Sequence, residues 1–304
     1  MTRTGAVGLA AAGLLFATGC ATTASSVSSA EGAPLRIVAA ENFWGSIARQ
    51  LGGSKATASS VIDKPGTDPH DYEPTAGDAR AFARAQLVVV NGVGYDPWAQ
   101  QLLSANPVGR RLVVKVGDLV GARAGDNPHR WYSPADVEQV IAAVTADLQR
   151  LDPKDAAYFA AQRQRLESRG LADYHRLIAE IKARYAGTPV GASESIFALM
   201  APALGLDLKT PTGFLKAISE GAEPSASDTS TADEQIRGGA IKVYVYNAQN
   251  TTADVRSQID AARRHGIPVT TITETPTPVN ASFQQWQTEQ LTRLAAALAK
   301  GTGG

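Results

Sequence analysis

The chain has 304 residues, 44% of them hydrophobic, which is enough to bury the core of one large domain or two modest ones. Its 29 basic and 29 acidic residues give a formal net charge of zero, which argues against a nucleic acid as partner, and no helix face gathers basic residues as a membrane-surface patch would. The single cysteine excludes an intramolecular disulfide.

The first 20 residues have the pattern of a lipoprotein signal peptide. An apolar stretch, residues 6–16, follows an early arginine and is too short to span a bilayer as a mature helix. The sequence ATGC resembles a bacterial lipobox, with Ala17 where leucine is usual, so we expect cleavage before Cys20 and a lipid on that cysteine. A plain secreted protein cut nearby is the alternative. Residues 21–34 predict a flexible tether, so the rest of the chain is expected outside the cytoplasm, anchored to the cell membrane.

Residues 35–150 alternate short apolar runs with helical stretches. The runs are almost continuously apolar, as strands buried on both faces are. We expect strands at 35–40, 56–62, 87–92 and 111–117, and helices at 41–53, 77–86, 96–106 and 133–151. The pattern predicts an N-terminal α/β lobe whose mostly parallel sheet has helices on both faces. Ligands of such sheets bind beyond the carboxyl ends of the strands.

Residues 151–187 predict one long linking helix, interrupted in pattern only by Gly170. The alternation resumes in residues 188–304, which we expect to form a C-terminal α/β lobe. Strands are expected at 188–193, 241–247 and 267–273, and helices at 195–205, 253–266 and 281–301. Residues 209–238 are predicted to be irregular, with a loop or short helix at 225–234.

Two nearly identical phrases, DPHDYEP at 68–74 and NPHRWYSP at 127–134, each present a histidine directly after a proline. Proline fixes its own backbone and favours an extended residue before it, so His70 and His129 are held rigidly. Histidine is the commonest metal-binding side chain. One such phrase alone is often a turn with a surface histidine, but two matching phrases near strand ends favour a metal site. The remaining two histidines, His175 and His265, are expected to be structural.

Two carboxylates of the second half occupy matching positions. Glu194 follows the apolar run PVGAS, and Glu274 follows PVTTIT. Each alone could be a solvated loop residue. Together with two neutral imidazoles they would neutralise a dication, and such a set of two nitrogen and two oxygen ligands suits manganese, iron or zinc. Glu274 is the fourth ligand that we expect; the alternatives are Asp207, Glu220 and Asp228.

From about residue 35 to residue 300 the chain resembles the zinc- and manganese-binding solute-binding proteins of bacterial ABC transporters. The resemblance lies in DPHDYEPTAGD, in NPHRWYSPADV, where the family usually has DPHxW, and in the closing FQQWQTEQLTRL. It implies two α/β lobes bridged by one long rigid helix, with the metal between the lobes and two ligands from each. On the matching positions it implies His70, His129 and Glu194 as ligands; the fourth is normally an aspartate, where this chain has Glu274.

We therefore expect a monomeric, extracytoplasmic, lipid-anchored protein that captures zinc or manganese as cargo and delivers it to an ABC permease and its ATPase. We do not expect an enzyme, because the sequence contains no HExxH motif, no second metal cluster and no Ser-His-Asp arrangement. The alternatives are a metal-dependent hydrolase that uses the same ligands around an open position, and a binding protein for a metal chelate.

Overall fold

The structure is a computed structural model that describes Met1 and residues 32–64 and 66–303. The predicted signal peptide, Cys20 and most of the predicted tether lie outside the described residues. From Pro34 onward the chain forms one compact unit. Along the described residues, no helix combines the length and the apolar character that crossing a membrane requires.

The first half of this unit contains a four-stranded parallel sheet in the order β2-β1-β3-β4. Its strands are β1 (Leu35–Glu41), β2 (Ala56–Ile62), β3 (Leu87–Val90) and β4 (Leu112–Lys115). Its helices are α1 (Asn42–Gly52), α2 (Ala76–Arg84), α3 (Pro97–Ala105), α4 (Val116–Leu119) and α5 (Pro134–Leu151), with the 3-10 turns η1 (Gly53–Lys55) and η2 (Arg130–Tyr132). Apolar residues of α2 and α3 cover one face of the sheet and those of α1 and α5 the other.

The second half repeats this topology with the strand order β6-β5-β7-β8, again parallel throughout. Its strands are β5 (Pro189–Ala192), β6 (Asp207–Leu208), β7 (Val243–Asn247) and β8 (Val269–Ile272). Its helices are α8 (Thr212–Ser219), α9 (Ala226–Arg237), α10 (Ala253–Arg264) and α11 (Phe283–Thr302). The predicted fold class, two parallel sheets covered by helices on both faces, is confirmed.

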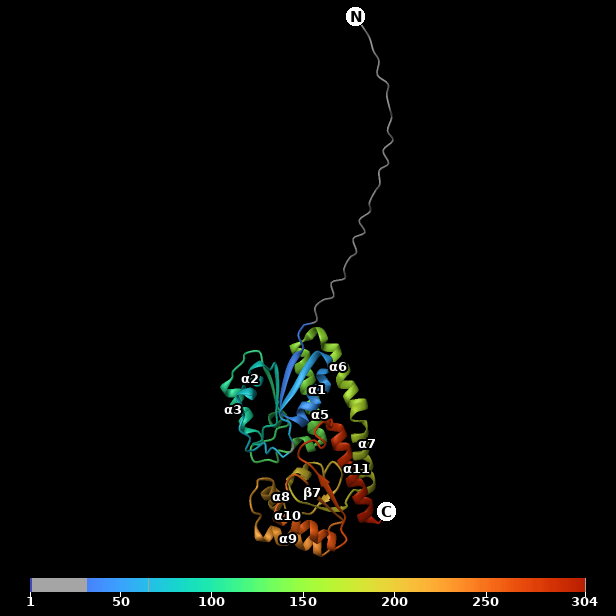
Figure 1. The fold of residues 1–304 in the computed structure, drawn as a ribbon. Coiled ribbons are helices and arrows are strands. Elements are labelled where there is room, and N and C mark those ends of the chain that lie inside the picture. The colour runs from blue at the N-terminus through green and yellow to red at the C-terminus, as the bar shows by residue number, and fades with distance from the viewer. Residues whose placement is uncertain (2–31, 65, 304) are drawn as a thin grey trace. The chain divides into compact units, whose positions relative to one another are not determined.

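The connection between the halves is helical but is not one unbroken α-helix. After a 3-10 turn, η3 (Pro153–Asp155), it consists of α6 (Ala156–Arg165), a π-helical turn, η4 (Leu166–Gly170), and α7 (Ala172–Tyr185). The π turn is closed by a hydrogen bond from the amide of Leu171 to the carbonyl of Leu166, 2.8 Å long. A β-carbon at Gly170 would lie 2.9 Å from Leu166 Cδ1, so a larger residue here would require the Leu166 side chain to shift. In Figure 1, α7 and α11 run side by side along one edge of the molecule.

Two expectations for the second half were wrong. Residues 195–205 form a 3-10 turn, η5 (Ser195–Leu199), followed by turns, instead of a helix, because Pro202 cannot take an interior helical position. The segment 209–238, expected to be irregular, contains α8, whereas α9 forms where residues 225–234 were expected to be a loop or a short helix. The polar helix α9 is held by the Ser225 hydroxyl, which accepts from the amide of Asp228, and by the buried side chains of Ala232 and Ile236 on one face.

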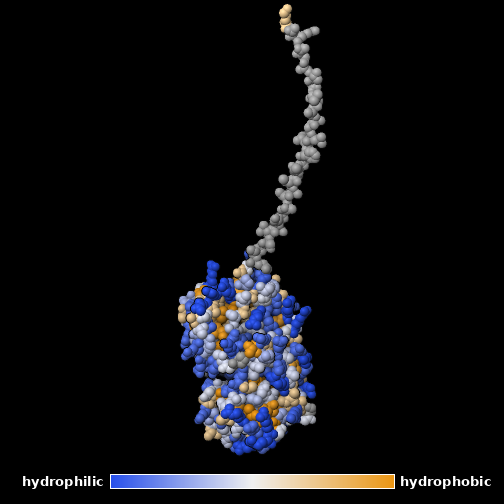
Figure 2. All heavy atoms as spheres, in the orientation of Figure 1, coloured by the Kyte–Doolittle hydropathy of each residue, from blue (hydrophilic) through white to orange (hydrophobic). Residues whose placement is uncertain are grey.

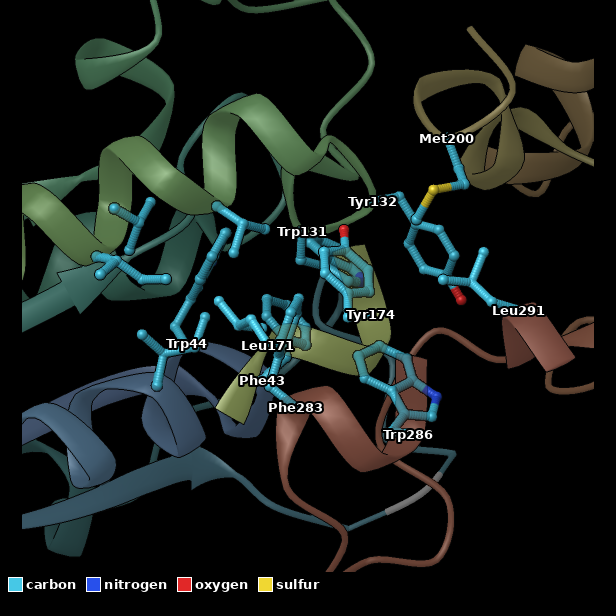
Figure 3. Packing of buried hydrophobic residues seen from close by; sticks show 14 of the residues in the cluster. Phe43, Trp44, Trp131, Tyr132, Leu171, Tyr174, Met200, Phe283, Trp286 and Leu291 are labelled. Carbon is cyan, nitrogen blue, oxygen red and sulfur yellow. The ribbon is translucent and has the colours of Figure 1, made fainter. Parts of the chain in front are cut away.

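The largest apolar cluster is shared by both halves. In Figure 3, Phe43 of α1, Trp131 of η2, Tyr174 of α7, and Phe283 of α11 meet in one cluster. The rings of Phe43 and Trp131 stack with centroids 4.0 Å apart. Two smaller clusters cover the remaining face of each sheet. The face seen in Figure 2 is mostly hydrophilic, with small and separate hydrophobic areas.

Candidate metal site

Segments that follow the strands of both sheets line one cavity of about 550 Å³. All four predicted ligands, His70, His129, Glu194 and Glu274, are among its lining residues. Because parallel strands end at one edge of a sheet, the two sheets present their carboxyl ends to this common space.

The first Pro-His phrase follows β2 and is shaped by Asp68. One carboxylate oxygen of Asp68 accepts from the backbone amide of His70 (2.9 Å) and from ring atom Nδ1 (3.1 Å). Since Nδ1 faces an acceptor, it carries the ring proton, and the lone pair of Nε2 is left for a ligand. The His70 ring packs edge-on to Tyr95, with centroids 5.0 Å apart.

The second phrase lies before η2 and repeats this geometry with an amide. Oδ1 of Asn127 accepts from the backbone amide of His129 (3.1 Å) and from its Nδ1 (2.8 Å). The same tautomer results. His129 is buried, its ring lies edge-on to Trp131, and its Nε2 is 3.7 Å from Oε1 of Glu274.

Glu194 follows β5 and is almost fully buried, with 2% of its surface exposed. Each carboxylate oxygen accepts from one amide group, Oε1 from Asn247 (2.5 Å) and Oε2 from Asn250 (2.8 Å). Burial raises the pKa of Glu194 to about 8, and the negative charge of Glu274 adds to the rise, while the two amides oppose it. A cation at this position would replace the proton.

Glu274 follows β8 and behaves in the opposite way. Burial would raise its pKa, but the neighbouring His129 ring and the Tyr95 hydroxyl, which donates to Oε1 (2.9 Å), hold the pKa below its usual range. The side-chain oxygen of Gln249 accepts from the amides of Glu274 (2.7 Å) and Thr275 (2.9 Å), which fixes the chain at this point.

Of the three alternatives for the fourth ligand, one lines the cavity and two do not. Glu220 lines the cavity, whereas Asp207 on β6 pairs with Lys209 at 2.6 Å and Asp228 lies in the first turn of α9. Of the other two histidines, His175 pairs with Glu138 across α7 and α5 (3.0 Å), and His265 ends α10.

His129 and Glu274 are the two predicted ligands that the structure brings close together, while His70 and Glu194 line the cavity with other partners. Within the described part of the chain, no three histidine, cysteine, aspartate or glutamate side chains are close enough to hold a metal ion together. Ligation by all four residues therefore stays a prediction, and it requires the side chains to converge on the ion.

Sequence reasoning missed the polar residues that support these four. Asn247 and Asn250 hold Glu194, and Tyr95 holds Glu274. One signal was available: Asn247 ends the apolar strand VYVYN at the same sheet edge as Glu194 and Glu274. Tyr95 had no such signal, because its role arises from a contact across 179 residues of sequence.

A buried pair of carboxyl groups lies beneath the Tyr95 loop. Asp96 accepts from the backbone amides of Asn91 and Gly92, both at 2.7 Å, and so closes the turn that carries Tyr95. Burial raises the pKa of Glu41, at the end of β1, well above its usual value, and the nearby Asp96 raises it further. Among the described residues, no hydrogen-bond donor reaches either oxygen of Glu41. A proton on Glu41 is the group that can bond to Asp96.

A family model described as the periplasmic component A of the zinc-uptake complex matches residues 37–297. The chain belongs to this family. The resemblance inferred from the Pro-His phrases is confirmed, and the family is one of metal-uptake components of ABC importers.

Among the relatives, the manganese-binding lipoprotein MntA of Halalkalibacterium halodurans is 28% identical over 153 residues, which cover 48% of this chain and 49% of that protein. The chain thus matches about half the length of this relative. The manganese ABC transporter substrate-binding lipoprotein PsaA of Streptococcus pneumoniae is 24% identical over 82% of both chains.

Two solved structures show the same fold. The Mn-bound periplasmic metal-binding protein of Candidatus Liberibacter asiaticus superposes with a TM-score of 0.71 at 18% identity and covers 87% of this chain and 99% of its own. The binding protein FpvC of P. aeruginosa, in complex with Ni²⁺, gives a TM-score of 0.70 at 21% identity and covers 89% of this chain and 98% of its own.

Proposed function

We propose that the protein captures a divalent transition metal ion, zinc or manganese, in the cavity between its two sheets and delivers it to an ABC transporter permease. The observation that carries this proposal is that His70, His129, Glu194 and Glu274, two from each half, line one cavity. Two neutral imidazoles and two carboxylates match the charge of a dication and the donor preferences of these metals.

The electrostatics of the cavity support a cation as ligand. Glu194 retains a proton partly because Glu274 is negatively charged, so the two carboxylates repel each other when both are ionised. A dication between them would convert this repulsion into attraction and would compensate charge in a partly desolvated site. The histidine Nε2 atoms, freed by Asp68 and Asn127, would supply the remaining ligands.

The decisive test is elemental analysis of the protein purified from its native host, followed by titration of the metal-free protein with Zn²⁺ and Mn²⁺. We expect one equivalent of metal per chain. A protein that carries no transition metal and binds neither ion in calorimetry would refute the proposal.

We further propose that the halves act as lobes, residues 35–150 and 188–304, joined by residues 151–187, and that a monomer docks on a permease driven by its ATPase. The lipid anchor is proposed on Cys20, because the lone cysteine ends a short apolar stretch. Replacing it, Cys20→Ala, should release the protein from the membrane fraction. A processed Cys20→Ala protein that stays in that fraction would contradict the anchor.

The cavity volume favours one second candidate, a metal chelate as cargo. At about 550 Å³ the cavity is far larger than a bare ion and lies in the range of small-molecule sites. Calorimetry with Mn²⁺ alone and with Mn²⁺ citrate distinguishes the two, since a chelate site binds the complex more tightly than the ion. We propose binding and not catalysis; turnover of ester or phosphoester substrates by the metal-loaded protein would contradict this.

A further inference from the structure

Asn127 is bonded to both halves of the molecule. Its Oδ1 accepts from the backbone amide and Nδ1 of His129 in the first half. Its Nδ2 donates to the backbone carbonyl of Ser195, in η5 of the second half, at 2.6 Å. The side chain that orients one predicted ligand thus also holds the residue next to another, Glu194.

The orientation of the Asn127 amide is fixed by its neighbours. With oxygen and nitrogen exchanged, the amide NH₂ would face the backbone N–H of His129, and the amide oxygen would face the carbonyl oxygen of Ser195. Both contacts would be repulsive, whereas the observed orientation satisfies every group.

The acceptor of this bond belongs to a well-anchored segment. The amide of Ser195 donates to the Ser219 hydroxyl (3.1 Å), and the two hydroxyls lie 2.7 Å apart. Since Ser195 directly follows Glu194, a pull on its carbonyl acts on the backbone that carries the Glu194 carboxylate. A bond from Asn127 therefore fixes His129 and Glu194 relative to each other.

The first phrase provides an internal comparison. Asp68 occupies the same place as Asn127, two residues before its histidine, and makes the same two bonds to it. Asp68 is mostly exposed, and its bonds to His70 stay within its own loop. An aspartate serves at a position that only orients a histidine. At position 127 an aspartate would place a carboxylate oxygen against the Ser195 carbonyl, so the amide is needed for its donor.

We propose that Asn127 is a positioning residue that latches the two halves together across the cavity and slows release of the metal ion. The inference rests on the proposed function, because the latch acts on the residues that would hold the ion. It adds to that function a residue, separate from the ligands, that determines how long the ion stays bound. The bonds from Asn127 to His129 set the geometry of that ligand. The bond from Asn127 to Ser195 determines how readily the two halves separate.

The test uses the isosteric variant Asn127→Asp in the full chain. It keeps the acceptor for His129 and removes the donor to Ser195. Release of Zn²⁺ into an excess of fluorescent chelator, followed by stopped flow, should become about tenfold faster, as the loss of one buried hydrogen bond implies, while the association rate constant is unaltered. Hydrogen–deuterium exchange of the metal-free protein should be faster at residues 193–199.

Asp68→Asn is the matched control. It makes the converse exchange of acid and amide beside the other histidine, so its effect on metal release reports the charge of the acceptor alone, and exchange at 193–199 should be unaltered. Asn127→Ala removes both sets of bonds and should release Zn²⁺ at least as fast as Asn127→Asp. Circular dichroism confirms that each variant is folded.

The outcomes separate the two claims. A wild-type protein that binds no metal ion overturns the proposed function, and the latch with it. A wild-type protein that binds Zn²⁺, together with a folded Asn127→Asp variant that releases it at the wild-type rate and shows wild-type exchange at 193–199, overturns the latch alone.

Discussion

Tyr132 joins the first half to the strand end that carries Glu274, and removing its hydroxyl tests how much that junction contributes. The hydroxyl donates to the carbonyl oxygen of Thr273 (2.8 Å), and Oε1 of Gln290 lies 3.1 Å away. The side chain is 1% exposed. In Tyr132→Phe the ring keeps its edge-on packing against Trp286, while the Thr273 carbonyl loses this donor.

Loss of one buried hydrogen bond, with an acceptor left unpaired, lowers the free energy of unfolding by about 1–2 kcal/mol. For a chain of this size that corresponds to a fall in Tm of about 2–4 °C. Because Thr273 precedes Glu274, we also expect metal affinity to fall by about threefold to tenfold, the range expected when one ordered group becomes mobile. Thermal unfolding in the presence of chelator gives the first number, and calorimetry with Zn²⁺ gives the second.

Tyr244→Phe is the control. The Tyr244 hydroxyl donates to Oε1 of Gln258 at 2.6 Å and is equally buried, but both residues belong to the second half and lie outside the cavity lining. This variant should lose similar stability and keep wild-type metal affinity. If Tyr132→Phe unfolds within 1 °C of the wild type, or if both variants weaken metal binding equally, the reasoning about the Tyr132 junction is refuted.

Three further predictions concern the carboxylates and histidines. His70→Ala and His129→Ala should each weaken Zn²⁺ binding about tenfold or more in calorimetry without unfolding the protein; near-wild-type affinity would remove that histidine from the site. Glu194→Gln and Glu274→Gln, measured side by side at fixed pH, should each lose about tenfold, or 1.4 kcal/mol, and a loss with Glu194→Gln alone would place the fourth ligand elsewhere. Burial raises the pKa of Glu41, so its stabilising contribution is complete below 4.5 and is lost as pH rises from there to the folded-state pKa. Over that interval the free energy of unfolding of Glu41→Gln, measured in urea, should decline less steeply than that of the wild type, and parallel curves would contradict this.

The features that the sequence predicts well are those determined locally. The strand LVVV at 87–90 is apolar at every position because it is buried on both faces. The geometry of each Pro-His phrase is determined by residues next to each other in the chain. The two parallel sheets could be predicted from such apolar runs, because the chain between them is long enough to form the crossover helix that parallel strands require.

What the sequence could not give depends on contacts between distant segments. The sequence left residues 225–234 open between a loop and a short helix, because half of α9 is serine, threonine and aspartate, which compete with the helix for backbone hydrogen bonds. The helix forms because the buried Ala232 and Ile236 pack beside β5 and α10. Hydrogen bonds between the two halves are made by Tyr95, Tyr132 and Asn127. Such bonds produce no periodic pattern in the sequence, so sequence analysis could not predict them.

The meeting of α1 with α11 has a consequence for how the molecule is assembled. The Ser46 hydroxyl accepts from the amide of Phe283, and the side-chain amides of Gln50 and Gln284, 234 residues apart, exchange two hydrogen bonds. Contacts of such separation form late, since most of the chain must be ordered before they close. A chain whose last helix has not yet emerged therefore lacks Phe283 and Trp286, the aromatic residues that α11 contributes to the cluster shared by both halves. The 20 residues of α11 therefore complete packing in both halves, and truncation within α11 should disturb α1 of the first half as well as β7 and β8 of the second.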